Sequence, residues 1–201
     1  MREEHKVQVK QFIRQLVPIP EVELEAFCQR ATYRDVSTGT DLVRAGEVCH
    51  ELWFIHEGTF RYYLLTHGQE HTKDFSPRQS LCTALTSLVT RTESQIYLGA
   101  LENAHISVWD GKYILELFDS TLPWQTLARR LIQWLYIRKE SREVSFLTEN
   151  ALERYQRFLK EFPSIAGFED VSERVPQHHI ASYLGMTPET LSRVRRQIKT
   201  S

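Results

Sequence analysis

Three polar residues near the end of the chain, Glu189, Ser192 and Arg193, share one face of an expected helix. Residues three and four positions apart lie side by side on a helix surface. An arginine can donate two parallel hydrogen bonds to guanine, and a glutamate can accept one from cytosine. A helix that carries such residues in its first turns can reach base edges in the major groove. The spacing therefore predicts direct contact with DNA bases.

Two short helices joined by a glycine turn must position this face. Pro176 suits the first turn of a helix, and Gly185 can adopt the left-handed backbone conformation that ends one. Thr187 is a favoured N-cap, and Pro188 is a favoured first residue of a second helix. The apolar residues at helical spacing are Ile180, Ala181 and Leu184, then Leu191, Val194 and Ile198. This pattern is typical of a helix-turn-helix.

Positive charge is concentrated in the same segment. Residues 187–201 contain four basic residues and one acidic residue, whereas the whole chain has a net charge of −1. Arg195, Arg196 and Lys199 suit phosphates better than bases. The alternative is a helix pair whose basic face is only solvated. The residues expected to contact DNA are Thr187, Glu189, Thr190, Ser192, Arg193, Arg195, Arg196 and Lys199.

The composition is that of an ordinary globular protein. The 201 residues are 41% hydrophobic and 25% charged, which allows one large domain or two small ones. No apolar run approaches the roughly 18 residues of a membrane span. Cys28, Cys49 and Cys82 are widely spaced and offer no zinc or iron–sulfur pattern. The N-terminus lacks a signal-peptide core, so we expect a cytoplasmic protein without a metal or other cofactor.

The first half of the chain is predicted to be a β-roll with flanking helices. Helical patterns cover residues 3–16 and 21–30. Short runs rich in β-branched and aromatic residues follow, separated by glycine and proline, which favours a sandwich or barrel. These runs lie at residues 41–45, 52–56, 60–65, 95–101 and 105–109. The expected fold class is therefore α+β.

A long helix is predicted at about 122–144, followed by another at 149–162. Leu127, Leu131 and Trp134 recur at three- and four-residue steps, as in a short coiled coil, and we expect them to form a dimer contact. Packing of this helix on the barrel is the alternative. The expected organisation is a sensor domain at 1–121, a dimerisation helix at 122–147 and a helix-turn-helix domain at 148–201.

Together these features resemble the Crp/Fnr family of bacterial transcription regulators, in particular its short members from Bacteroidetes-type bacteria. The motifs that carry the resemblance are Gly46-Glu47, Leu52-Trp53-Phe54-Ile55, Glu57-Gly58, Ala100-Leu101-Glu102, Ile180-Ala181-Ser182-Tyr183-Leu184-Gly185 and Thr187-Pro188-Glu189-Thr190-Leu191-Ser192-Arg193. The resemblance implies a cyclic-nucleotide-binding-type roll that senses a signal, and half-site reading by Glu189, Ser192 and Arg193. It also implies a palindromic operator in double-stranded DNA, a homodimer, a small-molecule effector and RNA polymerase as partners.

The roll departs from family members that bind cyclic nucleotides. Those members carry a Gly-Glu pair that holds the ribose and an Arg-Ser pair that neutralises the phosphate. Cys82-Thr83 and Ser94-Gln95 stand at these places, and Arg91 is out of step by three residues. A buried phosphate without a positioned cation is costly, so we expect no useful affinity for cyclic AMP. A different effector pocket is expected to involve Thr83, Arg91 and Gln95.

The end of the helix-turn-helix departs as well. Family members usually continue into a β-hairpin wing, whereas the sequence here stops three residues after Ile198. We expect a missing wing to reduce affinity more than specificity, because phosphate contacts position the protein and base contacts specify the site. The cysteine cluster of the iron–sulfur members is also missing from the sequence.

Two other classes of protein compete with this interpretation. A cupin-like metal-dependent enzyme would use clustered histidines, but His50, His56, His67 and His71 form no His-x-His pair. A scaffold protein would use the helix-turn-helix for protein contacts and would show no salt-dependent DNA binding. No nucleophilic triad, phosphate loop or carboxylate pair stands out, so we expect a protein that is not an enzyme.

Overall fold

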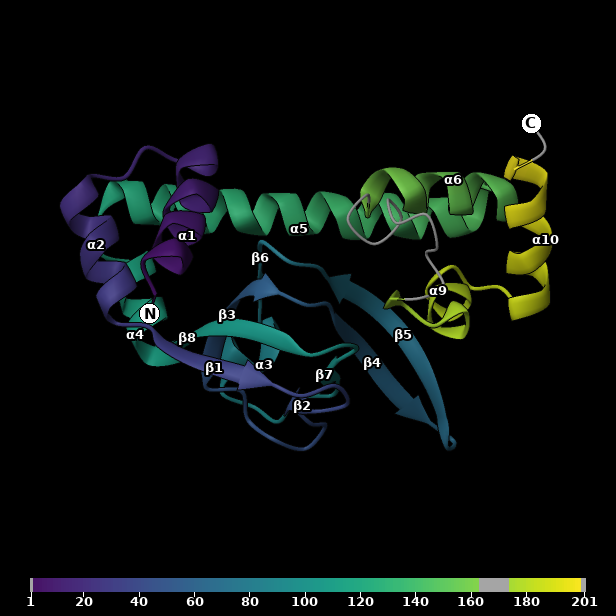
Figure 1. Ribbon diagram of the computed structural model, residues 1–201, viewed down its shortest axis with the longest axis horizontal. Helices are drawn as coiled ribbons and strands as arrows, with labels where there is room; N and C mark the ends of the chain where they lie inside the picture. Colours follow the sequence, from purple (N-terminus) through teal and green to yellow (C-terminus); the bar gives the residue numbers. More distant parts are fainter. Residues whose placement is uncertain (1, 163–173, 200–201) are drawn as a thin grey trace.

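Two antiparallel four-stranded sheets face each other in the computed structural model, which describes residues 2–162 and 174–199 (Figure 1). The first sheet has the order β1 (Thr32–Val36), β8 (Ala104–Asp110), β3 (Glu51–Glu57), β6 (Ser80–Cys82). The second has the order β2 (Asp41–Val43), β7 (Tyr97–Ala100), β4 (Phe60–Thr66), β5 (Gln69–Ser76). Because β5 ends its sheet, one of its edges is open to other elements.

Strand β3 shows why the roll needs helices around it. Successive side chains of a strand point to opposite faces, yet β3 is buried on both. Trp53 and Ile55 belong to the core between the two sheets. Leu52 and Phe54 belong to a second core, under the N-terminal helices. A strand that is covered on both faces has a continuous run of apolar residues in its sequence, and Leu52-Trp53-Phe54-Ile55 is such a run.

The N-terminal helices cover the outer face of the first sheet. They are α1 (Glu3–Leu16) and α2 (Glu21–Gln29). Helix α4 (Gly111–Phe118) follows β8 and contributes Ile114 to the same core, and a short helix, α3 (Leu85–Thr90), lies after β6. Trp109 of β8 stacks on Phe27 of α2 at 4.6 Å between ring centroids and donates its indole N–H to the Phe27 carbonyl at 2.9 Å. The indole N–H of Trp124 donates to Glu23 at 2.8 Å, which fixes the start of the next helix on α2.

The long helix α5 (Leu122–Thr148) runs across the width of the molecule, from the N-terminal helices to the C-terminal ones (Figure 1). Pro123 occupies its first turn, where a missing N–H costs nothing. The roll lies on one side of it. None of the helices within residues 2–162 and 174–199 combines the length and apolar character that a bilayer span requires.

The C-terminal helices are α6 (Ala151–Glu161), α9 (Gln177–Tyr183) and α10 (Pro188–Lys199). Asn150 caps α6, and Glu153 completes a capping box with it. These helices share a third core that also includes one residue of the roll, Phe75 of β5. The ring of Phe75 contacts those of Phe158 and Tyr183, so the roll and the C-terminal helices are packed together.

This architecture confirms the predicted α+β fold, with a β-roll, flanking helices, a long helix and a helical C-terminal part. Five elements were not predicted from the sequence: β1, β5, β6, α3 and α4. Strand β5 has the polar sequence Gln-Glu-His-Thr-Lys-Asp-Phe-Ser, which lacks an apolar alternation because most of its length lies at a sheet edge. The division into domains at 121 and 147 remains a prediction.

Candidate nucleic-acid interface

Helices α9 and α10 form the predicted helix-turn-helix. Gly185 has a φ of +61°, and the Met186 N–H donates to the Ala181 carbonyl at 3.0 Å, which closes α9 with a glycine cap. The Thr187 hydroxyl accepts from the Thr190 N–H at 3.2 Å and caps α10 as expected. Five of the six residues in the predicted apolar stripes are buried, namely Ile180, Ala181, Leu184, Leu191 and Val194, and the sixth, Ile198, is half-buried against the same core.

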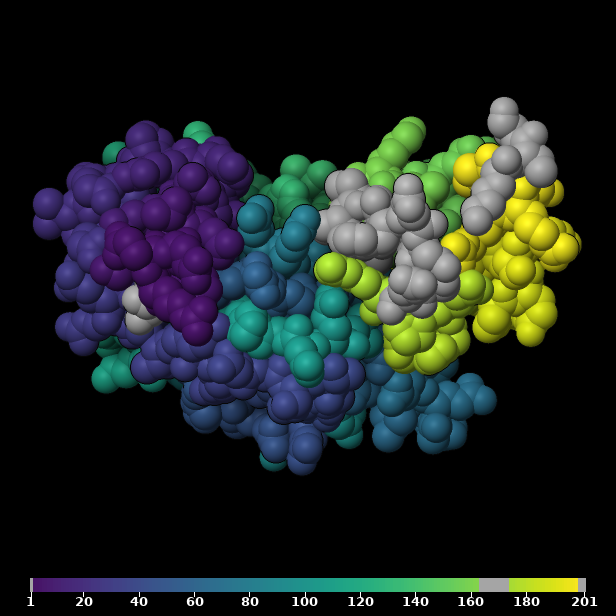
Figure 2. Space-filling view, in the orientation of Figure 1, coloured from purple at the N-terminus to yellow at the C-terminus, as the bar shows by residue number. Residues whose placement is uncertain are grey.

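The polar face of α10 is open at the end of the molecule (Figure 2). Glu189, Arg193 and Arg196 are exposed, and Ser192 is half-buried. Hydrogen bonds from its own backbone N–H and from the Thr187 hydroxyl hold the pKa of Glu189 below the usual range, so this carboxylate is charged at neutral pH and can only accept hydrogen bonds. The face therefore offers a donor and an acceptor for base edges.

The side chain of Arg195 does not lie on the outward face of α10, where the sequence predicted it. It is half-buried, and its guanidinium lies beside the hydroxyl of Tyr155 on α6, where it opposes the rise that burial causes in the tyrosine pKa. Tyr155 is itself buried. Arg195 follows the buried Val194 by only about 100° of helix rotation, which turns it toward α6 rather than outward. The backbone of Lys199 closes α10, and its side chain lies outside the described residues.

The three residues predicted for the dimer contact do not share one exposed face of α5. Leu127 is 1% exposed and belongs to the core under the N-terminal helices, so the prediction that it lies on a dimer face is wrong. Leu131 is half-buried against the same core, and only Trp134 is exposed. The other large apolar side chains exposed between residues 132 and 147 of α5 are Ile132, Tyr136, Ile137, Val144, Phe146 and Leu147.

The three candidates for an effector pocket are not arranged as one. The polar groups of Thr83 are used inside the roll: its N–H donates to the Tyr62 hydroxyl at 3.2 Å and its own hydroxyl donates to the Glu51 carbonyl at 2.9 Å. Burial raises the pKa of Tyr62 well above its usual range. Arg91 and Gln95 are exposed instead, and Arg91 ends α3 with a φ of +59°.

The four histidines considered for a metal-dependent enzyme differ in their exposure to solvent. His56 is buried, and its ring contacts Gln8 at 2.6 Å and Ser107 at 2.7 Å. His50, His67 and His71 are exposed. Within the part of the chain that the structure describes, no three His, Cys, Asp or Glu side chains meet in a way that could hold a metal ion.

Polar contacts that the sequence analysis missed hold α9 on the edge of the roll. His179 accepts a hydrogen bond from Arg61 of β4 at 2.6 Å between Nδ1 and Nη1, and Arg61 also pairs with Glu70 of β5. The Ser182 hydroxyl accepts from the Thr72 N–H at 2.9 Å. Only the tertiary fold brings residues more than 100 positions apart into contact, so no local sequence signal could have identified these pairs.

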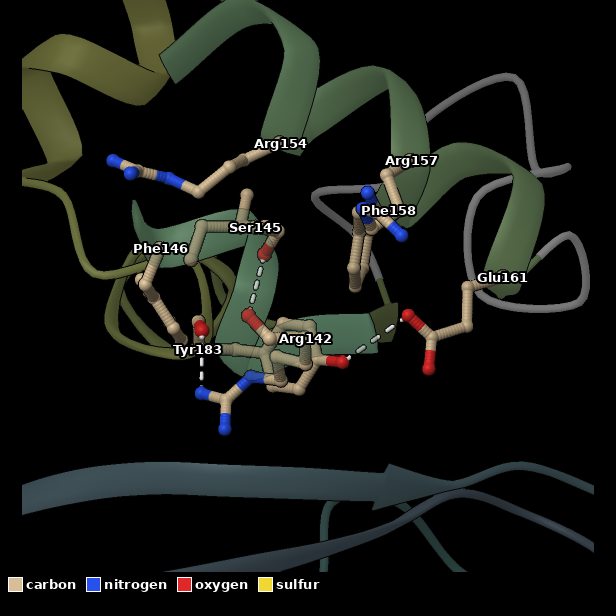
Figure 3. Close-up of a pocket in the computed structure, with 9 residues that line it drawn as sticks. Arg142, Ser145, Phe146, Arg154, Arg157, Phe158, Glu161 and Tyr183 are labelled. Atoms are coloured by element: carbon tan, nitrogen blue, oxygen red, sulfur yellow. Dashed lines mark hydrogen bonds between the residues drawn. The ribbon is translucent and has the colours of Figure 1, made fainter. Parts of the chain in front are cut away.

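A second missed group joins α5 to the turn of the helix-turn-helix. Figure 3 shows a small pocket between α5, α6 and α9, in which Phe146 lies between the guanidinium groups of Arg142 and Arg154. Arg142 donates to the Tyr183 carbonyl at 2.8 Å, at the end of α9. A Cβ added to Gly185 would lie 2.7 Å from Phe146, so α5 touches the turn directly.

Arg138 of α5 links this helix to β5 and to α6. It donates to Asp74 of β5 at 2.7 Å and to Glu161 of α6 at 2.6 Å. Burial raises the pKa of Asp74, and the Arg138 guanidinium opposes that rise. The roll, α5 and the C-terminal helices are therefore connected by buried charge pairs as well as by the aromatic core.

The comparisons with known proteins support this architecture. Neither protein-family models nor curated protein sequences gave a match. Among solved structures, the chain is similar to FixK2 from Bradyrhizobium japonicum, with a TM-score of 0.69, 20% identity, and 85% of each chain covered. A regulator from Eubacterium rectale assigned to the Crp/Fnr family gives 0.68 and 17%, covering 90% of this chain and 84% of that one.

A further solved structure has the same arrangement. The c-di-GMP responsive global regulator CLP from Xanthomonas campestris gives a TM-score of 0.66 at 14% identity, and the match covers 90% of this chain and 92% of that one. These identities are low, but each of the three matches covers at least 84% of both chains. The chain has the fold of the Crp/Fnr-family transcription regulators.

Proposed function

We propose that this protein belongs to the Crp/Fnr family and regulates transcription by binding a palindromic DNA site as a twofold dimer. The observation that carries the proposal is the exposed pair Glu189 and Arg193 in the first turns of α10, on a helix whose opposite face is buried. Two of the similar structures are named as regulators of transcription or of gene expression.

The base-reading roles follow from the exposure of each side chain. Arg193 would donate to guanine, and Glu189 would accept from cytosine. Ser192 lies on the same face but is half-buried, which favours a short-range contact close to the helix. Arg196 is exposed one turn further on and suits a phosphate. Arg195, packed beside Tyr155, is not assigned to the DNA contact.

The dimer contact would use the face of α5 that points away from the roll. Tyr136 and Ile137, then Val144, then Leu147 are exposed at steps of seven and three residues, the spacing of a coiled-coil seam. Ile137 is 63% exposed and Leu147 is 87% exposed, whereas soluble proteins rarely leave a row of such side chains uncovered. A twofold pairing here would set two copies of α10 about 34 Å apart, one turn of DNA.

The proposed regulator does not use cyclic AMP. In the roll, the Tyr62 hydroxyl and the Glu51 carbonyl occupy the hydrogen-bonding groups of Thr83. Arg91, which lies three residues before the expected position of the phosphate-binding arginine, is exposed. Calorimetric titration of the purified chain with cyclic AMP should therefore give no heat of binding. A dissociation constant in the micromolar range or below would contradict this part of the proposal.

Selection of bound sequences from a random DNA pool tests the main proposal. The expected product is a palindrome with half-sites one helical turn apart. Replacing Arg193 with Ala should then cost on the order of 1–3 kcal/mol of discrimination per half-site, because the guanine contact is lost. Replacing Arg196 with Ala should weaken binding to every sequence and reduce the salt slope by about 1 per protomer.

Arg44 provides a matched control. It is an exposed arginine directly after β2, which lies at the edge of its sheet opposite β5, so Arg44→Ala should change neither discrimination nor the salt slope. If no sequence is enriched, or if Arg193→Ala leaves binding to the selected site unchanged, the assignment of the base-reading face is wrong. A flat salt dependence would favour a protein-binding role for the helix-turn-helix.

A further inference from the structure

A row of stacked rings joins the N-terminal helix α1 to the first sheet. The ring of His5 on α1 lies between two rings of the roll. It stacks on His56 of β3 at 4.1 Å between centroids and on Tyr33 of β1 at 4.9 Å. The row continues from Tyr33 to His105 of β8 at 6.0 Å. Three of these four rings are therefore histidines, and they come from three different elements.

His56 is the innermost histidine of this row, with 1% of its surface exposed. Its Nδ1 lies 2.6 Å from the amide oxygen of Gln8 on α1, and its Nε2 lies 2.7 Å from the Ser107 hydroxyl. A neutral imidazole offers one donor and one acceptor for two such contacts. Both partners are uncharged, so a proton added to His56 would place a positive charge in the interior. Burial, and then the charges of His5 and His105, lower the pKa of His56 to about 3.

His5 is also held in its neutral form. It is 6% exposed, and within the described residues its Nδ1 has no hydrogen-bond partner. Its Nε2 lies 3.8 Å from the carboxylate of Glu4, which is largely exposed, so this ion pair is weak. Burial lowers the pKa of His5, and Glu4 opposes this only in part. Of the other charged groups that act on His5, Glu57 of β3 favours its protonation, whereas Arg2 of α1 and His105 of β8 oppose it.

The outer histidine of the row has different surroundings. The side chain of His105 is 44% exposed, and both of its ring nitrogens face carboxylates. Its Nδ1 lies 2.6 Å from Asp35 of β1, and its Nε2 lies 3.7 Å from Glu57. These carboxylates can balance a charge on His105, and that charge in turn disfavours protonation of His5 and His56. The two inner rings must therefore stay neutral for α1 to lie on β3.

The attachment of α1 to α2 does not respond to acid in the same range. Lys10 donates to Glu21 at 2.7 Å and to Glu25 at 2.6 Å, and Lys6 donates to Glu25 at 2.8 Å. Hydrogen bonds from Lys10 and Lys6 lower the pKa of Glu25 to about 2, so this carboxylate stays charged in mild acid. Acid therefore weakens the contact of α1 with the roll and leaves its ion pairs with α2.

We propose that the stacked pair His5 and His56 is an acid-sensitive switch, which holds α1 on the roll at neutral pH and releases it as the pH falls. A released histidine titrates at about pH 6.5. Because the docked rings stay neutral, docking is strongest above pH 6.5 and weakens as the pH drops below it. The switch lies at the opposite end of the molecule from α10 (Figure 1), and it does not depend on the proposed function.

Hydrogen exchange of the full chain at pH 7 and pH 5, followed by mass spectrometry, tests this switch. Protection factors, corrected for the pH dependence of a free amide, are compared for peptides of α1 and α2. His56 alone should favour the release of α1 by about 25-fold more at pH 5 than at pH 7, because its pKa rises from about 3 to about 6.5 on release. The protection of α1 should therefore fall by at least this factor, and at pH 5 it should lie below that of α2.

Two variants change the response to pH while keeping the contacts. Gln8→Glu would place a carboxylate beside Nδ1 of His56 and balance the charge of the protonated ring, so the drop in α1 protection should be about twofold to tenfold smaller. His5→Phe keeps a stacked ring that cannot titrate, so its drop should also be smaller than that of the wild type. Each variant is compared with itself at two pH values, so a changed stability at pH 7 does not affect the result.

His71→Asn is the control, since this histidine of β5 is exposed and its charge does not act on His5 or His56. It should show the wild-type drop. Equal protection of α1 and α2 at pH 5 would overturn the proposal, because α1 would then open only together with α2. A wild-type drop in both Gln8→Glu and His5→Phe would overturn it too, because the titrating groups would then lie elsewhere.

Discussion

Replacing His179 with Asn should remove a pH-dependent part of the stability that α9 gains by packing on the roll. Arginine has only donors, so the 2.6 Å contact with Arg61 requires Nδ1 of His179 to be an unprotonated acceptor. Burial, then the charges of Arg61 and His178, lower the pKa of His179 from 6.5 to about 4, and Glu70 opposes them. An asparagine keeps a carbonyl acceptor at this position and does not titrate.

The sign of the effect follows from proton linkage. Between pH 6.5 and about pH 4 the unfolded state binds a proton on His179 that the folded state does not bind. The free energy of unfolding is therefore highest above pH 6.5 and falls as the pH drops through that window. For a shift of this size, the loss between pH 7 and pH 5 is about 2 kcal/mol. Burial lowers the pKa of His56 to about 3 and acts in the same direction, so only the difference between variants isolates His179.

Urea unfolding of the wild type and of His179→Asn at pH 7 and pH 5 measures this difference. The wild type should lose about 2 kcal/mol more than the variant on acidification. His50→Asn is the control, since this histidine is exposed and its charge does not act on His179, and it should keep the wild-type pH dependence. An equal loss in the wild type and in His179→Asn would refute the reasoning, because His179 would then not be held neutral by this contact.

Three further predictions concern packing. Gly185→Ala should lower the free energy of unfolding by more than the roughly 1–2 kcal/mol of left-handed backbone strain, because the new Cβ would lie 2.7 Å from Phe146. In urea titrations, the extra loss should disappear when Gly185→Ala is made together with Phe146→Ala. The same loss with and without Phe146 would contradict the contact. Phe75→Ala should lower stability by about 3–5 kcal/mol in thermal unfolding, whereas a loss below 1 kcal/mol would mean that the aromatic core does not hold the roll to the C-terminal helices. Ile137→Glu should convert a dimer to a monomer in sedimentation experiments. Leu127→Ala should cost about 2–5 kcal/mol of stability and leave the folded protein dimeric. The opposite result for the two variants would show that Leu127, not Ile137, lies in the dimer contact.

The helix-turn-helix could be predicted because its signals are local. A proline start, a glycine stop, a threonine cap and apolar residues at helical spacing each act within a few residues of their own position. The structure has the same caps at Gly185 and Thr187, and it buries the apolar stripe that was expected. The exposure of Glu189 and Arg193 follows directly from that stripe, since one buried face of a helix determines which residues are left outside.

The helical period alone could not determine which neighbour each face of α5 meets. Leu127 and Ile137 are both apolar, but one is buried under the N-terminal helices and the other is exposed. One of these neighbours, Glu23 of α2, accepts from Trp124 although it lies 101 positions earlier in the chain, so the contact is invisible in the sequence of α5 itself. The position of Arg195 beside Tyr155 also depends on a tertiary contact, because α6 packs against a side of α10 that the sequence predicted to be exposed.

The sequence by itself determined the two helices of the helix-turn-helix, their caps and the polar face of α10, because these depend on backbone preferences and on spacing within one helix. Tertiary structure alone decided the contacts between distant segments: His179 on Arg61, Phe146 on Gly185, and Arg138 on Asp74. Such contacts depend on how the β5 edge, α5 and α9 are placed in space. That placement is set by long-range packing around Phe75, for which no single stretch of sequence carries the information.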